Sequence, residues 1–222
     1  MHPSRRNKAL PPGRNNEGRE GSARRQPRLG RFDVSVSAFL AQQRLGALAE
    51  GPRAELIGGR VVVPANPGPA EAAALAGLMQ AIEAADPAAY GVVALRAAPL
   101  RLSPSDLLRA DIALLREAGA LPRGHAHRPA QVGLGIGGSF DPAAAVLIVE
   151  ISAGRPSHEQ RLPLYAAAGA RDVWLLDLRR GWVEAFRSPW RGLYRSRTLW
   201  YPGERIPLVA LAGLFIEALP PP

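Results

Sequence analysis

Two apolar runs separated by 21 residues are the feature of this sequence that most limits its fold. In residues 145–151 the hydrophobic side chains do not alternate with polar ones, and residues 173–176 form a second such run. Runs of this kind are typical of strands buried on both faces. The residues between them, from about Ser157 to Ala168, favour a helix that ends at Gly169. Strand, helix and strand at this spacing predict two parallel strands joined by a crossover, and therefore an α/β domain.

Other segments extend this unit into a mixed sheet. Gly58 and Gly59 lie between two β-prone runs in residues 54–63 and can supply the positive φ values of a tight hairpin turn. Residues 182–187 and 193–199 favour an antiparallel extension. We therefore predict one α/β domain with a mixed sheet flanked by helices. The remaining predicted elements are a short helix from Ser35 or Ser37, a helix over 71–85, strands at 92–95, 99–102 and 112–115, and a long loop over 117–143.

The positive charge of the chain is concentrated near its N-terminus. The sequence has 28 Lys and Arg against 19 Asp and Glu, a net charge of +9. Residues 1–31 carry nine of the basic and two of the acidic side chains, which leaves a net charge of only +2 for residues 32–222. We expect residues 1–31 to be a disordered basic tail that attracts phosphates without sequence preference, and residues 32–222 to be the folded domain.

Composition and simple motifs exclude several functional classes. The sequence has no cysteine, which excludes disulfides, thiolate zinc sites and cysteine nucleophiles and is compatible with a cytoplasmic protein. No run approaches the roughly 18 uncharged apolar residues of a membrane span, so we expect no membrane partner. The glycine-rich stretch 133–138 is followed by a strand, which argues against a phosphate-binding loop. His125 and His127 lack further ligands nearby and favour a solvated loop.

Three acidic residues lie where a carboxylate is costly. Glu150 is near the C-terminal end of the buried strand, Asp111 opens a short apolar run, and Glu55 lies in the first strand of the hairpin. A carboxylate in an apolar strand is destabilising unless a cation or a hydrogen-bond donor meets it. If the three converge on one face of the sheet, a hard divalent cation such as Mg²⁺ or Mn²⁺ is the natural counter-charge. The alternative is that each is a strand-end residue that reaches solvent.

Five short blocks occur in a characteristic order and spacing. They are Glu-Leu-Ile-x-Gly-Arg-Val-Val-Val at 55–63, Ala-Asp-Ile-Ala-Leu-Leu at 110–115, Val-Leu-Ile-Val-Glu-Ile-Ser at 146–152, Arg-Leu-Pro-Leu-Tyr-Ala-x-Ala-Gly at 161–169 and Val-Trp-Leu-Leu-Asp at 173–177. Together they resemble the Uma-type putative restriction endonuclease family of the PD-(D/E)XK nuclease-like superfamily. The resemblance implies a restriction-endonuclease-like core and a metal-dependent phosphodiesterase that acts on DNA.

The resemblance also implies roles for four residues. Asp111 stands at the family's Pro-Asp motif and Glu150 at the acidic residue of the following strand, and both would hold Mg²⁺ or Mn²⁺. Glu55 matches the Glu of the family's first hairpin, which is often counted with the active site. Arg161 falls where the family usually places a Lys. In the superfamily's mechanism the metal lowers the pKa of a bound water and neutralises charge that grows on the phosphate.

The sequence departs from the family pattern near these positions. Ala110 replaces the Pro of the Pro-Asp motif, and Glu71 stands where relatives commonly carry a His. Ser152 occupies the superfamily's Lys position, and the only lysine in the sequence is Lys8. Arg161 must therefore take the place of the Lys, although an arginine can bind phosphate but cannot accept a proton.

Three interpretations stay open at this point. The first is a metal-dependent DNA endonuclease that acts with Arg161 in place of Lys. The second is a catalytically degenerate relative that binds nucleic acid or a protein without cutting. The third takes the acidic residues as unrelated strand-end carboxylates and the chain as a homodimerising module, with its four tryptophans in the core or at an interface. Whether the carboxylates of Asp111 and Glu150 come together separates the third interpretation from the other two.

Overall fold

The computed structural model describes residues 33–46, 53–116, 139–152 and 157–218. The predicted tail lies outside these ranges, and so do residues 117–138, which hold most of the predicted long loop, the glycine-rich stretch and the two loop histidines. No helix within the described ranges is long and apolar enough to cross a membrane. In chain order the elements are α1 (Val36–Arg44), β1 (Glu55–Ile57), β2 (Arg60–Val62), α2 (Pro69–Ala84), η1 (Pro87–Tyr90), β3 (Val92–Arg101), β4 (Leu107–Arg116), η2 (Pro142–Ala144), β5 (Ala145–Ser152), α3 (Ser157–Ala167), β6 (Asp172–Asp177), β7 (Trp182–Trp190), β8 (Leu193–Trp200), β9 (Arg205–Pro207) and β10 (Phe215–Glu217).

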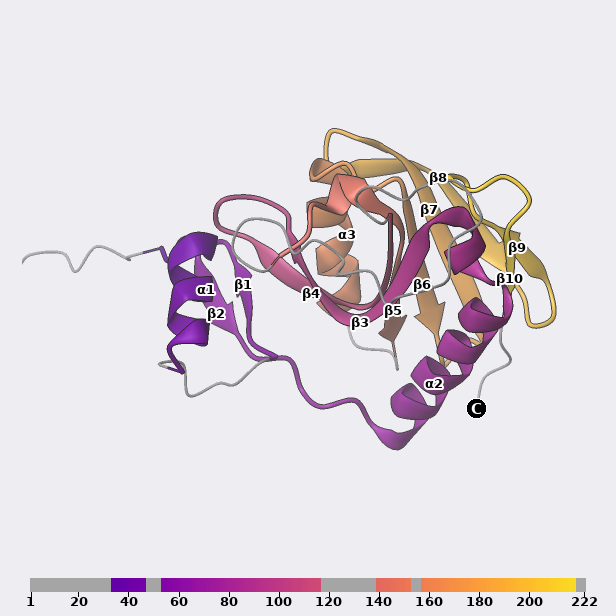
Figure 1. The fold of residues 1–222 in the computed structure, drawn as a ribbon, viewed down its shortest axis with the longest axis horizontal. Coiled ribbons are helices and arrows are strands. Elements are labelled where there is room, and N and C mark those ends of the chain that lie inside the picture. Colours follow the sequence, from indigo (N-terminus) through magenta and orange to yellow (C-terminus); the bar gives the residue numbers. More distant parts are fainter. Residues whose placement is uncertain (1–32, 47–52, 117–138, 153–156, 219–222) are drawn as a thin grey trace, which may run out of the picture. The chain divides into compact units, whose positions relative to one another are not determined.

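Eight strands form one mixed sheet with the order β2-β1-β4-β5-β6-β7-β8, in which β3 pairs with β4 (Figure 1). β5 and β6 are parallel, with α3 between them in the chain, and the other pairs are antiparallel. β9 and β10 form a separate antiparallel pair. All residues of β5 are buried, as predicted for a central strand. The predicted α/β fold with a mixed sheet is therefore confirmed.

β4 brings the first hairpin next to the end of β5. β3 pairs with β4 over nearly its whole length and so occupies one of its edges. A strand has only two hydrogen-bonding edges, so the other edge of β4 is shared. β5 pairs there with residues Ile112 to Leu115, and β1 pairs at Leu107. Because β4 and β5 are antiparallel, the end of β5 that carries Glu150 is the end closer to β1.

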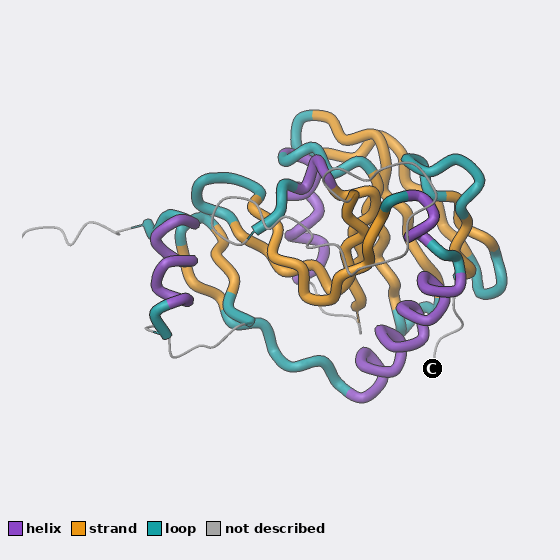
Figure 2. Tube along the Cα trace, viewed as in Figure 1, coloured by secondary structure: helices purple, strands orange, loops and turns teal. Residues whose placement is uncertain are grey.

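α2 and α3 cover opposite faces of the sheet (Figure 2). Leu78 of α2 belongs to the core cluster that contains Leu147 of β5, whereas Tyr165 of α3 belongs to the cluster that contains Ile148. Successive side chains of a strand point to opposite faces, so the two helices lie on opposite sides of β5. Glu150 has the same parity as Ile148 and therefore faces α3.

The β1–β2 hairpin turns at Gly58 and Gly59, as predicted. Their φ values of +55° and +71° suit a two-residue turn of type I′. Gly59 is also required for close packing, because a Cβ atom there would lie 2.6 Å from the Cβ of Asp33. Just after Asp33, Ser35 begins α1, as predicted, by accepting a hydrogen bond from the Ala38 N–H at 3.2 Å. The segment that leads into α1 therefore packs directly on the turn.

The predicted bounds of the third and fourth strands were wrong. The two strands predicted between residues 92 and 102 are one strand, β3, although Ala97 within it has a φ of +49°. β4 begins at Leu107, well before the predicted start. Polar side chains in both strands interrupt the apolar pattern from which the strands were predicted. As a result, Asp111 lies in the middle of β4 and does not open it.

Candidate functional site

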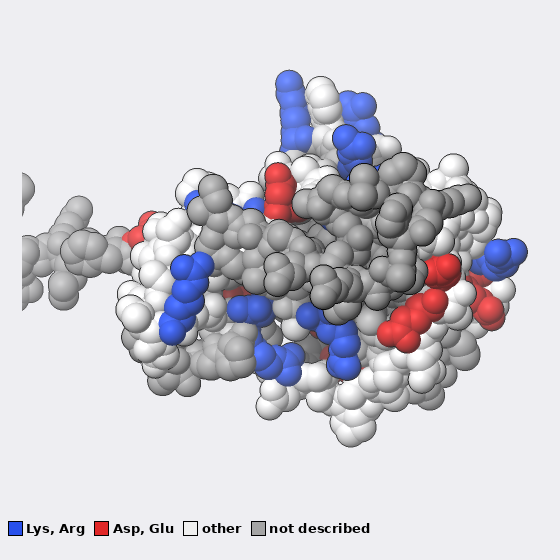
Figure 3. Space-filling model, in the orientation of Figure 1, with Lys and Arg blue, Asp and Glu red and all other residues white. Residues whose placement is uncertain are grey.

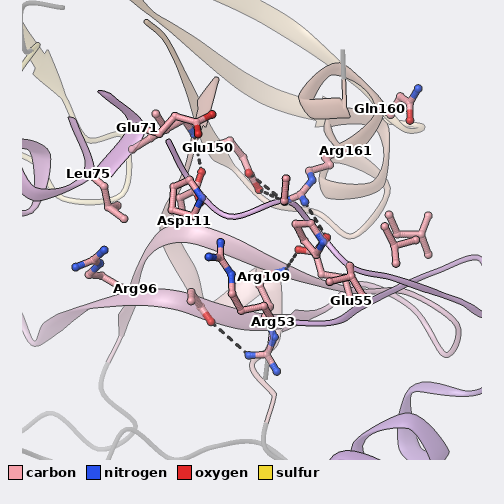
Figure 4. Close-up of a pocket in the computed structure, with 18 residues that line it drawn as sticks. Arg53, Glu55, Glu71, Leu75, Arg96, Arg109, Asp111, Glu150, Gln160 and Arg161 are labelled. Atoms are coloured by element: carbon pink, nitrogen blue, oxygen red, sulfur yellow. Dashed lines mark hydrogen bonds and ion pairs between the residues drawn. The ribbon is translucent and has the colours of Figure 1, made fainter. Parts of the chain in front are cut away.

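The predicted site residues line one cavity of about 780 Å³ (Figure 4). Glu55 comes from β1, Asp111 from β4, Glu150 from β5 and Arg161 from α3. The three carboxylates therefore converge, which the interpretation as unrelated strand-end residues does not explain. Apolar residues of β1, β2, α2 and the β2–α2 connection also line the cavity: Ile57, Val62, Val63, Pro64, Ala65, Pro67 and Leu75.

The Arg161 guanidinium joins two of the carboxylates (Figure 4). Its Nη2 lies 2.7 Å from Glu55 Oε2, and its Nη1 lies 3.2 and 3.1 Å from Glu150 Oε1 and Oε2. Glu55 and Glu150 are only 1% and 2% exposed. Removing a carboxylate from water is costly, and the bonded guanidinium offsets part of that cost.

Tyr165 adds a second donor to Glu150. Its hydroxyl, which is fully buried, donates a hydrogen bond to Glu150 Oε1. Tyr165 and Arg161 are four residues apart in α3, so their side chains lie one turn apart on the same face of the helix. This face points at Glu150, and one helix therefore supplies both the cation and the hydroxyl that hold this carboxylate.

Burial raises the pKa of two glutamates that line the cavity, Glu55 and Glu150. Desolvation raises the pKa of Glu55 to about 7, although Arg161 and the hydrogen bond from the Arg109 N–H act in the opposite direction. Burial also raises the pKa of Glu150, again against the attraction of Arg161. For Arg161 itself burial lowers the pKa, and the two glutamates raise it by more, so its guanidinium stays protonated. Glu55 is therefore a group that titrates near neutral pH.

Asp111 is fixed beside Glu150 by the backbone of β5. Its Oδ2 accepts a hydrogen bond from the Ile151 N–H at 2.8 Å, and Asp111 itself is half-buried. Carboxylate oxygens are the ligands that hard divalent cations prefer. Among the residues that the structure describes, no group of three or more Asp, Glu, His or Cys side chains is arranged to hold a metal ion. The pair Asp111 and Glu150 as metal ligands therefore stays a prediction.

Comparison with known proteins links this arrangement to a family. The model of the Uma2 family, described as putative restriction endonuclease, matches residues 36–218. The chain belongs to the Uma2 family. Among curated proteins, none matches the sequence. A solved structure with a similar fold, a putative nuclease belonging to DUF820 from Anabaena variabilis ATCC 29413, has a TM-score of 0.58 and 14% sequence identity, with 83% of this chain and 95% of that chain covered.

Membership of the Uma2 family confirms the resemblance carried by the five sequence blocks. The solved neighbour confirms the mixed-sheet α/β fold, because at 14% identity its likeness concerns the fold alone. The Uma2 match supports a nuclease. The roles of individual residues, the metal and the catalytic activity stay predictions.

Two residues at the site, Arg109 and Tyr165, were not predicted from the sequence. The Arg109 N–H donates to Glu55 Oε1 at 2.7 Å, and its guanidinium lies 3.3 Å from Gln43 Oε1. A signal was present for both. Arg109 stands two positions before Asp111 in a strand, and Tyr165 stands one helical turn after the predicted Arg161.

Further arginines line the same cavity. Arg53 and Arg96 are both exposed, and the Arg53 guanidinium also donates to Asn66 Oδ1 at 3.1 Å. Figure 3 shows basic side chains gathered around a hollow on this face of the molecule. The cavity thus combines buried carboxylates with a basic border, an arrangement that suits a cation and a phosphate together.

Proposed function

We propose that this protein is a divalent-metal-dependent endonuclease that hydrolyses phosphodiester bonds in DNA. The observation that carries the proposal is the convergence of Glu55, Asp111, Glu150 and Arg161 at one cavity in a member of the Uma2 family. Each residue comes from a different element, so the convergence depends on the sheet topology and not on a local motif. Phosphodiester hydrolysis needs a cation and a phosphate held side by side, which such a cavity can accommodate.

Asp111 and Glu150 are the proposed ligands of Mg²⁺ or Mn²⁺. The described residues that line the cavity include no cysteine or histidine, so the donor set consists of oxygen atoms and fits a hard cation better than zinc. The Ile151 N–H bonded to Asp111 and the Tyr165 hydroxyl bonded to Glu150 orient the two carboxylates. When bound, the ion lowers the pKa of a coordinated water and neutralises charge on the phosphate.

In this proposal Arg161 and Glu55 together take the place of the Lys that the family usually has at the position of Arg161. Arg161 holds Glu55 and Glu150 through three hydrogen bonds but, as a permanently protonated group, takes up no proton. Glu55, with a pKa of about 7, exchanges protons at neutral pH and can accept the proton that an attacking water loses. Proton transfer is therefore assigned to a Glu55 carboxylate oxygen.

The DNA backbone is proposed to meet the arginines at the border of the cavity, Arg53, Arg96 and Arg109. Guanidinium groups bind phosphate oxygens in a bidentate manner. Residues 1–31 would add salt-sensitive affinity without sequence preference, because they carry nine basic and two acidic side chains. A chain without these residues should bind DNA more weakly at low salt and keep its metal-dependent cleavage.

Nicking of a supercoiled plasmid with Mg²⁺ or Mn²⁺ tests the proposed activity. Glu150→Gln should lower the rate by about 10²–10³-fold, the range measured when one transition-state contact is lost. Glu184→Gln is the matched control, since Glu184 is 3% exposed and lies 2.7 Å from Arg197 Nη2 but does not line the cavity. The control should cut like the parent. Equal rates in the two variants, or a parent that cuts with neither metal, would overturn the proposal.

A catalytically degenerate protein that binds DNA without cutting is the second candidate function. The observation that favours it is the Arg161 guanidinium, which already supplies the counter-charge of Glu55 and Glu150. Arg161→Lys separates the two candidates, because an ammonium group is a compact charge without the planar fork of a guanidinium. Nicking or Mn²⁺ binding that appears only in this variant would establish the second candidate. A parent that cuts as well as the variant would exclude it.

A further inference from the structure

The hairpin formed by β7 and β8 ends in an exposed tip that takes no part in the cavity. We define the hairpin tip as Trp190, Arg191, Gly192, Leu193 and Arg195. Trp190 pairs with Leu193, so the two residues between them form the turn. Trp190 is 51% and Leu193 is 68% exposed. Two large apolar side chains exposed at the same point, next to basic ones, are a feature of interaction surfaces.

The backbone of the hairpin tip is strained at Arg191. The φ values of Arg191 and Gly192 are +50° and +77°, as in a type I′ turn, whose first position favours Asn, Asp or Gly. A long side chain at positive φ is unfavourable. The sequence therefore keeps a basic side chain at the end of the hairpin where a glycine would be relaxed. Strain of this kind occurs preferentially at functional positions.

Two arginines near the tip of this hairpin are not paired with acidic residues in the described part of the chain. Residues 185–203 include four arginines and no Asp or Glu. Two of these arginines form ion pairs with carboxylates of β6 and β7. Arg191 and Arg195 form no ion pair within the described part of the chain, and their guanidinium carbons lie 5.3 and 4.3 Å from the centroid of the Trp190 ring. Figure 3 shows basic side chains standing over this hairpin at the top of the view.

We propose that the hairpin tip is a second nucleic-acid contact, which binds an unpaired DNA strand. Arg191 and Arg195 contact phosphates, and the ring of Trp190, a residue that is 51% exposed, stacks on a base. Aromatic rings beside arginines bind single strands in this way, without sequence preference. The choice of DNA rests on the proposed nuclease function, since the charge and the ring alone would fit any flexible polyanion with flat groups.

Two simpler explanations account for less of the hairpin tip. β8 lies at the edge of the sheet, and charged side chains on an edge strand prevent pairing with other chains. This explains Arg195, which lies within β8, but not the strained Arg191 in the turn. An anionic lipid surface would also attract exposed Trp and Arg side chains. However, the tip offers only Trp190 and Leu193 for insertion among lipid acyl chains. Binding to lipid vesicles is therefore measured as a separate outcome of the test below.

Fluorescence anisotropy with a labelled oligothymidine, measured on the full-length protein in EDTA over a series of NaCl concentrations, tests the proposal. Arg191→Gly should weaken binding and lower the slope of log K against log [NaCl] by about 1. Its melting temperature should equal or exceed that of the parent, because glycine is relaxed at positive φ. Arg191→Lys keeps the charge and should bind like the parent. Trp190→Ala should raise Kd about fivefold or more.

Arg180→Ala is the matched control, because the Arg180 guanidinium carbon also lies over a tryptophan ring, 5.6 Å from the Trp182 centroid, away from the tip. It should change Kd by less than about twofold. Unchanged Kd values for Arg191→Gly and Trp190→Ala would overturn the proposal. Two other results would also overturn it. One is weaker binding of these variants to phosphatidylserine vesicles, and the other is a change in their self-association, each with DNA binding unchanged. Because EDTA prevents metal-dependent cleavage, a protein that binds through the tip but never cuts would refute the proposed function alone.

Discussion

Two buried carboxylates of the same sheet, Glu150 of β5 and Asp172 of β6, are each bonded to an arginine, but only Glu150 borders the cavity. They are 2% and 1% exposed, and burial raises the pKa of both. Their arginines differ in what else they hold. Arg161 bonds to Glu55 as well as to Glu150, whereas Arg187 bonds to Asp172 and to a backbone carbonyl.

The difference separates a structural ion pair from a candidate site. Around Asp172 the Trp174 Nε1–H and the Val209 N–H complete the hydrogen bonding, and one arginine balances one carboxylate. At the cavity two buried carboxylates share one arginine. A buried acid with a raised pKa is therefore not in itself a sign of function, because both regions have one. The excess of carboxylates beside an open volume is what distinguishes the cavity.

The largest expected change in stability is at the structural pair. Asp172→Ala leaves Arg187, whose side chain is 16% exposed, without its counter-charge. The free energy of unfolding should fall by about 3–5 kcal/mol, as for other broken buried pairs. Urea denaturation measures it, with Asp172→Asn as the control that keeps a hydrogen-bond acceptor and should lose less. A loss below about 1 kcal/mol for Asp172→Ala would show that this pair does not hold the sheet together.

At the cavity the expected effect depends on pH. The pKa of Glu55 is about 7 in the folded protein against an ordinary value of 4.5. The protonated form therefore stabilises the fold, fully below pH 4.5, and this contribution is lost as the pH rises through about 7. This contribution is on the order of 3 kcal/mol, because a pKa difference of one corresponds to about 1.4 kcal/mol. Glu55→Gln cannot ionise, so its melting temperature should fall less than that of the parent between pH 5 and 8.

Glu184→Gln is the control for this pH profile, because Glu184 is equally buried but lies outside the cavity. The change in its melting temperature between pH 5 and 8 should equal that of the parent. If Glu55→Gln and the parent lose stability equally between pH 5 and 8, Glu55 does not titrate there, and its proposed role as a proton acceptor fails with it.

The residues of the cavity could be predicted one by one, but their bonding could not. Glu55 and Glu150 are conspicuous in sequence because each interrupts an apolar run, and Arg161 stands at a family position. Their contact through one guanidinium depends on β1 and β5 sharing an edge of β4. No local sequence pattern encodes the bond between Arg161 and Glu55, because these residues are 106 positions apart.

The structural ion pair between Asp172 and Arg187 could not be predicted for a different reason. Asp172 stands before an apolar run, so it looks like an ordinary strand-end residue, and Arg187 is the last residue of the predicted strand 182–187. The two meet because β6 and β7 are antiparallel neighbours, in a register that places them opposite each other. The antiparallel extension after β6 was predicted, but composition and periodicity do not reveal that its register brings Asp172 and Arg187 together.

A smaller effect is expected from the two tyrosines that hold the two regions. Tyr165→Phe removes a hydrogen bond to Glu150, and Tyr194→Phe removes one to the Ala170 carbonyl oxygen at 3.0 Å. Each should cost about 1–2 kcal/mol of unfolding free energy. Only Tyr165→Phe should also raise the Mg²⁺ concentration needed for half-maximal nicking, because Tyr165 orients Glu150, a proposed ligand of the ion. An unchanged Mg²⁺ requirement in Tyr165→Phe, or an equal rise in Tyr194→Phe, would remove Tyr165 as a positioning residue.

The smallest effect is expected at an exposed pair of the same chemical type. The Arg180 Nη1 lies 3.5 Å from Asp177 and 3.9 Å from Glu184, but its side chain is 56% exposed. Arg180→Ala should change the free energy of unfolding by less than about 0.5 kcal/mol, since solvent screens such pairs and no carboxylate loses its last partner. Glu184 keeps Arg197, and Asp177 keeps the backbone N–H of residue 180. Urea denaturation at low and high NaCl should give the same small difference. A loss comparable to that of Asp172→Ala would mean that charge pairing, and not burial, sets the strength of these contacts.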